Sequence, residues 1–263
     1  MYKVKEETRE AATNGPESSP MDMDTSGAMF GSHSIPLFIH AGGIALSVNK
    51  QGDSLLYKRE SEHETIERVL LADNAQLIIN PVEPLNKPKE ISPFLHIGFK
   101  KSLVVAPRIS RVVFISFPIE VGVFISKGKD IESIDIFTLM KQKFTLYGDP
   151  RNGIICKSWE SDVHFVIPSP TPLHEGVLSL KVTNTTDKWL EVSQAVFNAY
   201  GMKIYYNKGS VSMKASMRIM SSRIAETDFT DSPVMEEMDK SLELYTIRKL
   251  VVATTKYVME AGI

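Results

Sequence analysis

Short apolar runs separated by turn-forming residues recur along the chain from residue 30 to the C-terminus. Residues 35–39 (IPLFI) are followed by Gly42 and Gly43, and the alternating run at 44–48 (IALSV) ends at 49–53 (NKQGD). β-Branched and aromatic residues favour strands, whereas Gly, Asn and Asp favour the turns that connect strands. This pattern predicts a mainly β fold.

The chain also resembles itself at an offset of 83 residues. At this offset residues 94–99 (FLHIGF) align with 177–182 (VLSLKV), and residues 109–114 (ISRVVF) align with 192–197 (VSQAVF). The gap that follows falls at a turn, where insertions are tolerated, so we predict an internal duplication of a β unit of about 85 residues. The alternative is a chance match between two ordinary strand patterns.

Units with several short strands and long proline-bearing connections are typical of Greek-key sandwiches. We therefore expect two tandem β-sandwich units of immunoglobulin-like topology, in which Phe114 and Phe197 fill equivalent core positions. The chain of 263 residues is long enough for two domains, which we place at 30–150 and 151–263. Residues 1–29 have almost no bulky apolar side chains and are expected to form a disordered tail.

One short helix is expected near the C-terminus, from residue 233 to about residue 240. Ser232 can cap it, Pro233 suits its first position, and Glu236 and Glu237 would lie near its positive end. Residues 249–259 are expected to form one or two strands.

Charge and apolar content limit the partners that this chain can have. The formal net charge is only −2, which is too weak a field to indicate nucleic acid or an anionic membrane as partner. The most apolar window, at 103–125, is as long as a membrane span but is interrupted by prolines and charges, so we interpret it as buried strands. Its interrupting residues are Pro107, Arg108, Arg111, Pro118 and Glu120.

A single cysteine, Cys156, can form neither an intrachain disulfide nor a zinc site by itself. The N-terminus has no apolar run after its basic residues, so we expect no secretory signal and a cytoplasmic location. We interpret Cys156 as a buried strand residue. The six histidines are scattered and no catalytic motif is present, so we predict no metal ligand, no cofactor and no catalytic residue.

The segment at the boundary between the two units is the most unusual one. Tyr147, Asp149, Arg151 and Trp159 offer charge, hydrogen bonding and a flat apolar surface, and a junction between units can form a cleft. We predict that these four residues bind a ligand or partner. The structural alternative is that Gly, Asp-Pro and Asn-Gly simply form turns here and that Trp159 packs an interface.

At this segment the sequence resembles a known family. Residues 147–163 (YGDPRNGIICKSWESDV), with 55–61 (LLYKRES), are similar to an archaeal family of uncharacterised proteins, a domain of unknown function. The resemblance covers most of the chain after residue 30. It implies an archaeal cytoplasm, and it assigns no activity and no residue role.

Two functions fit these features, and the sequence leaves open whether the chain is an enzyme. The leading hypothesis is a non-catalytic binding or protein-interaction module whose partner is an unknown protein or small ligand. The alternative is an enzyme that acts on a small or carbohydrate-like substrate between the units, with Asp149, Glu160 and Asp162 as acid/base candidates. Attachment to a membrane protein through a sheet edge is a third possibility, which no sequence motif supports.

Overall fold

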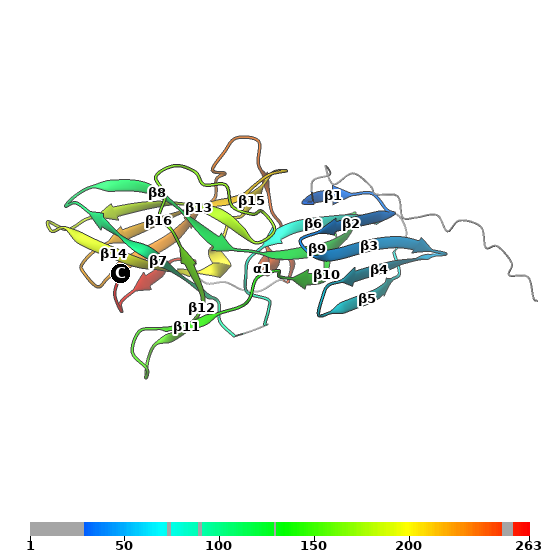
Figure 1. Cartoon of the computed structure of the whole chain (residues 1–263), viewed down its shortest axis with the longest axis horizontal. Helices are drawn as coiled ribbons and strands as arrows, with labels where there is room; N and C mark the ends of the chain where they lie inside the picture. The colour runs from blue at the N-terminus through cyan, green and yellow to red at the C-terminus, as the bar shows by residue number, and fades with distance from the viewer. Residues whose placement is uncertain (1–28, 73–74, 89–90, 129, 249–254) are drawn as a thin grey trace, which may run out of the picture.

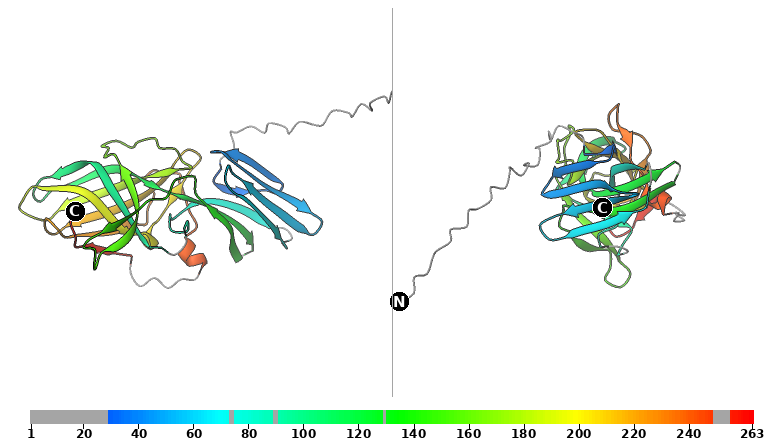
Figure 2. Two further views of the ribbon diagram at one scale, coloured as in Figure 1. Left: turned by 60° about the horizontal axis from the view of Figure 1, so that its bottom comes forward. Right: turned by 90° about the vertical axis from the view of Figure 1, so that its right-hand side faces the viewer.

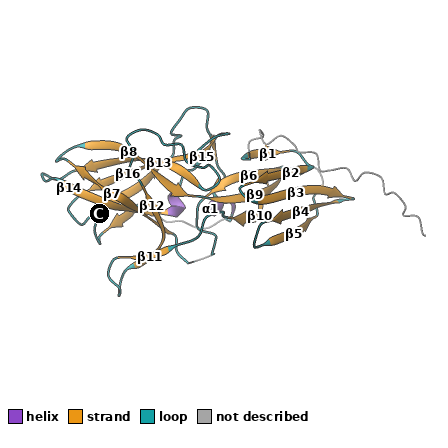
Figure 3. Ribbon diagram, viewed as in Figure 1, coloured by secondary structure: helices purple, strands orange, loops and turns teal. Residues whose placement is uncertain are grey.

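The computed structural model describes residues 29–263 with the exception of 73–74, 89–90, 129 and 249–254. The tail expected at 1–29 therefore lies outside the described residues, apart from Met29. Strands dominate the described part of the chain, and its helices are short (Figure 3). The prediction of a mainly β fold is confirmed.

Two antiparallel sheets form what we call the first β body, on the right of Figure 1. Their strand orders are β1-β6-β9-β10 and β2-β3-β4-β5. The bounds are β1 Gly31–His33, β2 Leu37–Ala41, β3 Ile44–Gln51, β4 Ser54–Glu60, β5 Thr65–Leu70, β6 Gln76–Val82, β9 Glu120–Lys127 and β10 Asp130–Phe137. The β2–β5 sheet lies as a separate layer beside the strands β6, β9 and β10 (Figure 2).

Two further sheets form the second β body, on the left of Figure 1. One has the order β11-β12-β7-β14; the other has the order β18-β15-β16-β13-β8, with β17 paired to β16 and β19 paired to β17. The bounds are β7 Phe94–Val105, β8 Ser110–Pro118, β11 Phe144–Tyr147, β12 Ile154–Ser161, β13 Glu175–Asn184, β14 Leu190–Asn198, β15 Tyr205–Tyr206, β16 Val211–Ile219, β17 Ala225–Thr230, β18 Asp239–Lys240 and β19 Tyr257–Met259. Two short helical turns complete the fold, the 3₁₀ turn η1 at Ala199–Gly201 and α1 at Leu244–Ile247.

Alternation of apolar residues explains how the strands face the core. In β3 the buried residues are Ile44, Leu46 and Val48, which point to one side because successive side chains of a strand point to opposite faces. A two-residue turn then leads into β4, and its first residue, Gly52, has φ 59°, a left-handed conformation that costs glycine little.

A buried ion pair connects the two layers of the first body. The Arg59 Nε of β4 donates to the Asp135 Oδ2 of β10 at 2.6 Å, and the Tyr57 hydroxyl donates to the same oxygen at 2.7 Å. Arg59 also donates to Glu64 at 2.8 Å and lies 4.8 Å from the ring centre of Phe137. These contacts satisfy the buried charges across the layers, as their burial requires.

The chain passes between the two bodies more than once. It builds β1–β6 in the first body, β7 and β8 in the second, β9 and β10 in the first again, and then β11–β19 in the second (Figure 1). The sheets therefore extend across residue 150, the expected domain boundary, because β7 pairs with both β12 and β14. Two pairs in the second body, β7 with β12 and β13 with β16, are parallel, which departs from a purely antiparallel Greek-key sandwich.

The long apolar window at 103–125 does form strands, as expected, since it spans the end of β7, β8 and most of β9. The prediction of one short helix near the C-terminus is confirmed, but its expected position at 233–240 is wrong. Those residues form bends followed by β18, which pairs with β15, and α1 begins four residues later at Leu244. Of the strands expected at 249–259, β19 is present, while 249–254 lie outside the described residues.

The expected equivalence of Phe114 and Phe197 also fails. Phe197 is fully buried, whereas Phe114 is only half-buried and its neighbours Val113 and Ile115 face the core. A register difference of one residue moves a side chain to the other face of a strand, and this separates the two phenylalanines.

We expect Phe197→Ala to lower the free energy of unfolding by about 3–5 kcal/mol, because it opens a cavity in a closed core. The Phe197 ring is 0% exposed and its centre lies 5.1 Å from that of Phe229. Urea unfolding measures the loss, with the exposed Phe38→Ala as a control that should cost less than about 0.5 kcal/mol. A loss below about 1 kcal/mol for Phe197→Ala would contradict its place in the core.

Candidate functional site

A line of polar contacts, which we call the polar seam, joins β12 to β8 and to the start of β9. The Ser161 Oγ accepts the backbone N–H of Ser116 at 2.7 Å, and the indole Nε1–H of Trp159 donates to the Ser116 Oγ at 2.9 Å. Further along the same face of β12, the Lys157 Nζ donates to the Glu120 Oε1 at 2.9 Å. Alternate residues of β12 therefore hold this strand to β8 and to β9, which belong to two other sheets.

The ion pair of the seam is buried and fully engaged. The side chains of Lys157 and Glu120 are 4% and 0% exposed. Glu120 also accepts the backbone N–H groups of Asn86 and Lys87 at 2.9 and 3.1 Å, and Lys157 donates to the Lys87 carbonyl at 3.0 Å. Burial lowers the pKa of the Lys157 ammonium, and the Glu120 carboxylate offsets part of that change. This pair holds the β6–β7 connection against both bodies.

A second buried carboxyl, that of Glu83, lies in the same connection. Its residue is 4% exposed, and its Oε2 has no hydrogen-bond partner among the described residues. Burial raises the pKa of this carboxyl from 4.5 to about 7, while the backbone N–H of Leu244 opposes the rise. Its backbone carbonyl accepts from Asn86 Nδ2 at 3.0 Å, and Arg248 donates to the Asn86 Oδ1 at 2.6 Å.

A hollow with a volume of about 340 Å³ lies at the end of the polar seam that contains Ser116, Trp159 and Ser161. We call it the Trp159 pocket. One wall is fixed where the chain after β12 bridges to β8, since Phe114 and His164 exchange two backbone hydrogen bonds of 2.8 Å. Its size falls at the lower end of small-ligand sites. The lining residues are Lys100, Ser116, Trp159, Glu160, Ser161, Asp162, His164, Pro168, Ser169, Pro170 and Glu175.

The residues that line this pocket include three acidic residues, Glu160, Asp162 and Glu175, and one lysine, Lys100. The Lys100 ammonium donates to the Asp162 Oδ2 at 2.9 Å, and both side chains are about half exposed. This hydrogen bond holds the pKa of Asp162 below its ordinary value and raises the pKa of Lys100. Glu160 and Glu175 also act on Lys100 through space.

The four residues predicted from the sequence do not come together. The Tyr147 hydroxyl is held by the C-terminal segment, because it donates to the Gly262 carbonyl at 2.9 Å and accepts from the Ala261 N–H at 3.1 Å. The Asp149 carboxylate accepts the backbone N–H of Arg151 at 2.8 Å within its own turn. Trp159 lies roughly 17 Å along β12 from that turn, at the strand rise of about 3.3 Å per residue.

The three acid/base candidates are likewise divided. Glu160 and Asp162 line the Trp159 pocket, whereas Asp149 belongs to the turn at the other end of β12. A general acid needs a raised pKa, but the ion pair with Lys100 lowers the pKa of Asp162. The arrangement of these described residues therefore does not favour acid/base chemistry.

Sequence reasoning found Trp159 but missed the side chains around it. Lys100, Ser116, His164 and Glu175 come from β7, β8, the segment after β12 and β13. The parallel pairing of β12 with β7 brings Lys100 close to Trp159, whereas Ser116 and Glu175 come from the sheet in which β8 pairs with β13. No local sequence pattern reports such pairings.

The prediction that Cys156 is a buried strand residue is confirmed, since it lies in β12 and is 0% exposed. Burial raises the pKa of its thiol to about 12, so the reactive thiolate is disfavoured. Among the residues that the structure describes, no group of three or more His, Cys, Asp or Glu side chains is placed to hold a metal ion. In the same residues, no helix has the length and apolar character of a membrane span.

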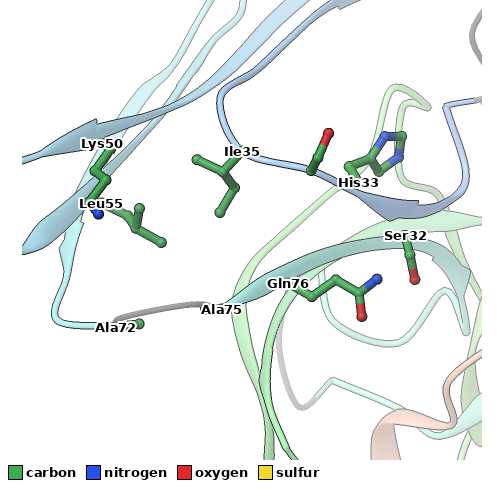
Figure 4. Close-up of a pocket in the computed structure, with 9 residues that line it drawn as sticks. Ser32, His33, Ile35, Lys50, Leu55, Ala72, Ala75 and Gln76 are labelled. Atoms are coloured by element: carbon green, nitrogen blue, oxygen red, sulfur yellow. The ribbon is translucent and has the colours of Figure 1, made fainter.

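Another hollow, of about 540 Å³, lies in the first body between the two layers (Figure 4). Lys50 and Leu55 line one side, and His33 and Gln76 line the other. The His33 ring is engaged with the Met29 carbonyl at 2.9 Å. We assign no function to this hollow.

Comparison with known proteins identifies the chain at the level of a family. A family model described as "Protein of unknown function (DUF432)" matches residues 29–260. No curated protein and no solved structure matches the chain. The resemblance to a domain of unknown function noted in the sequence is thus confirmed.

We expect Lys157→Met to lower the free energy of unfolding by about 3–5 kcal/mol, because it leaves the Glu120 carboxylate buried without its cation. Adding Glu120→Gln should recover part of the loss, since the glutamine is neutral and its single side-chain oxygen can still accept one of the two backbone N–H groups of Asn86 and Lys87. Urea unfolding of both variants measures this coupling. If the free-energy costs of Lys157→Met and Glu120→Gln simply add in the double variant, the ion pair is contradicted.

Glu83 should make stability depend on pH. Because its folded pKa is raised, it stabilises the fold at low pH, and this contribution is lost as the pH rises through about 7. Glu83→Gln should therefore gain about 2 kcal/mol relative to the unaltered chain between about pH 5.5 and about pH 8.5. The exposed Glu132→Gln is the control, and equal pH profiles with and without Glu83 would disprove the assignment.

Proposed function

The chain belongs to the DUF432 family of proteins of unknown function, and on that premise we propose that it is a non-catalytic interaction module. Its Trp159 pocket would bind a cationic side chain of a partner protein. The observation that carries this proposal is the lining of the pocket, which includes a tryptophan, three acidic residues and one lysine.

The indole ring is held in place before any ligand binds. Its Nε1–H donates to the Ser116 Oγ, and Ser116 is itself bonded through its backbone to Ser161. Tryptophan is the aromatic residue that attracts cations most strongly over its ring face, by roughly 0.5–2 kcal/mol. A ring that is already oriented binds with less loss of side-chain entropy.

The balance of charge around the ring supports a positively charged ligand. Lys100 is occupied by Asp162, so the excess negative charge of the pocket belongs to Glu160 and Glu175. Neither forms an ion pair with another described side chain. Both are available to a guanidinium or ammonium group, and charge-assisted hydrogen bonds are roughly twice as strong as neutral ones.

We also propose the duplication that the sequence indicated, now as a swapped pair of sheets. The order β11-β12-β7-β14 parallels the order β15-β16-β13-β8, with a parallel pair, β12–β7 or β16–β13, at the centre of each. In each sheet the strand on one side is antiparallel and comes from the other copy, as β14 beside β7 and β8 beside β13. This correspondence supports a duplication. We further propose a cytoplasmic location, which the free, buried cysteine fits, and an archaeal origin, which rests on the resemblance of residues 147–163 alone.

The two tryptophans of the chain allow a direct test. Trp189 is 68% exposed, so Trp189→Phe should fold normally and leave Trp159 as the only tryptophan. We expect its fluorescence to change in a saturable way with N-acetyl-arginine amide. N-Acetyl-citrulline amide, which has the same shape without the charge, should bind at least about tenfold more weakly, a difference of about 1.4 kcal/mol.

The double variant Glu160→Gln with Glu175→Gln removes both of these carboxylates. It should lower the affinity for the arginine probe to the affinity for the citrulline probe. Glu132→Gln with Glu191→Gln removes the same charge from exposed positions elsewhere and is the matched control. Equal binding of arginine and citrulline, or an equal loss in both double variants, would refute the proposal.

A further inference from the structure

An apolar pocket shares one wall with the Trp159 pocket. Its volume is about 330 Å³, and residues 168–170 (Pro-Ser-Pro) line both hollows. The remaining lining has an apolar part, formed by Ile167, Val177, Val211, Val234 and Met235, and a smaller part formed by Asn207, Gly209, Ser210 and Ser212. Two hollows of opposite character are thus separated by three residues of chain.

The segment that forms this wall also exposes apolar side chains. Phe165 and Val166 are 73% and 74% exposed, and Ile167, which lines the apolar pocket, is 44% exposed. Single exposed apolar residues are ordinary, but a run of three beside an apolar hollow is typical of a surface that contacts a partner.

We propose that the two pockets bind two side chains of one extended partner peptide, a basic residue in the Trp159 pocket and an aliphatic residue in the apolar pocket. This inference rests on the proposed function and names its partner. The excess carboxylates of Glu160 and Glu175 select the basic residue by charge complementarity. The aliphatic lining selects its apolar neighbour.

The shared wall also sets the spacing between the two side chains. In an extended peptide, alternate side chains point to the same side and lie roughly 7 Å apart. Residues 168–170 span a similar length of chain. The partner is therefore expected to carry its basic and aliphatic residues two positions apart rather than adjacent.

Short peptides added to the Trp189→Phe chain test this inference. The probe Ac-Ser-Arg-Ser-Leu-Ser-NH₂ should bind about tenfold or more tightly than Ac-Ser-Arg-Ser-Ser-Ser-NH₂, since burial of a leucine is favourable by about 1.5–3 kcal/mol. Ac-Ser-Arg-Leu-Ser-Ser-NH₂, with adjacent residues, should lose most of that gain. Replacing Arg by Glu in the first probe should abolish binding.

Met235→Ala should remove the gain from leucine and leave the affinity for the serine probe unchanged. Met235 is only partly buried, so the variant is expected to fold. Met220→Ala, at an exposed methionine outside the pocket, is the control.

The outcomes separate this inference from the proposed function. If the leucine and serine probes bind equally, the two-pocket inference is wrong while the arginine site stands. If no arginine peptide binds, the proposed function fails as well. If the chain self-associates in sedimentation and Met235→Ala abolishes this association, the apolar pocket binds a second copy of the chain. That result would overturn the proposal of a peptide partner.

Discussion

The buried pair of Lys157 and Glu120 is the contact on which the arrangement of the two β bodies depends. Glu120 is the first residue of β9 in the first body, and Lys157 lies in β12 of the second. The β6–β7 connection meets them through the backbone of Asn86 and Lys87. Two charges removed from water are tolerated only with such complete partnering, so the three chain segments must meet in one geometry. The Trp159 pocket lies at the other end of the same line of contacts.

The same logic recurs in the first body, where Arg59 of β4 binds Asp135 of β10 between two apolar layers. Hydrophobic burial alone is non-directional and would allow the layers to slide or slip in register. A buried charge is costly without its partner, and this makes one alignment far better than its neighbours. The apolar core supplies most of the favourable energy of folding, while these polar pairs select one alignment of the strands.

Local chemistry was a good guide to strands and a poor one to their partners. The apolar runs, the strand character of residues 103–125 and the burial of Cys156 follow from alternation and turn residues alone. The helix expected after Ser232 had a cap and a good first residue, but helices of about eight residues are marginal without an apolar face to bury. There Lys240 instead binds Asp231 and Glu243, and β18 pairs with β15. The sequence indicates Trp159 through its neighbours along the chain, whereas its neighbours in space depend on strand pairings such as that of β12 with β7, which only the tertiary fold determines.

The interleaved path of the chain through the two bodies has a consequence for synthesis on the ribosome. The first body lacks its edge strand until Phe137 has emerged, and β7 and β8 have already been made by then without the strands β14 and β13 that cover them. Neither body can therefore complete its sheets in order from the N-terminus. The nascent chain exposes apolar strands until their partner strands have been synthesised. The seam residues on β12 arrive only after both β8 and β9, so the two bodies can be fixed against each other only late in translation.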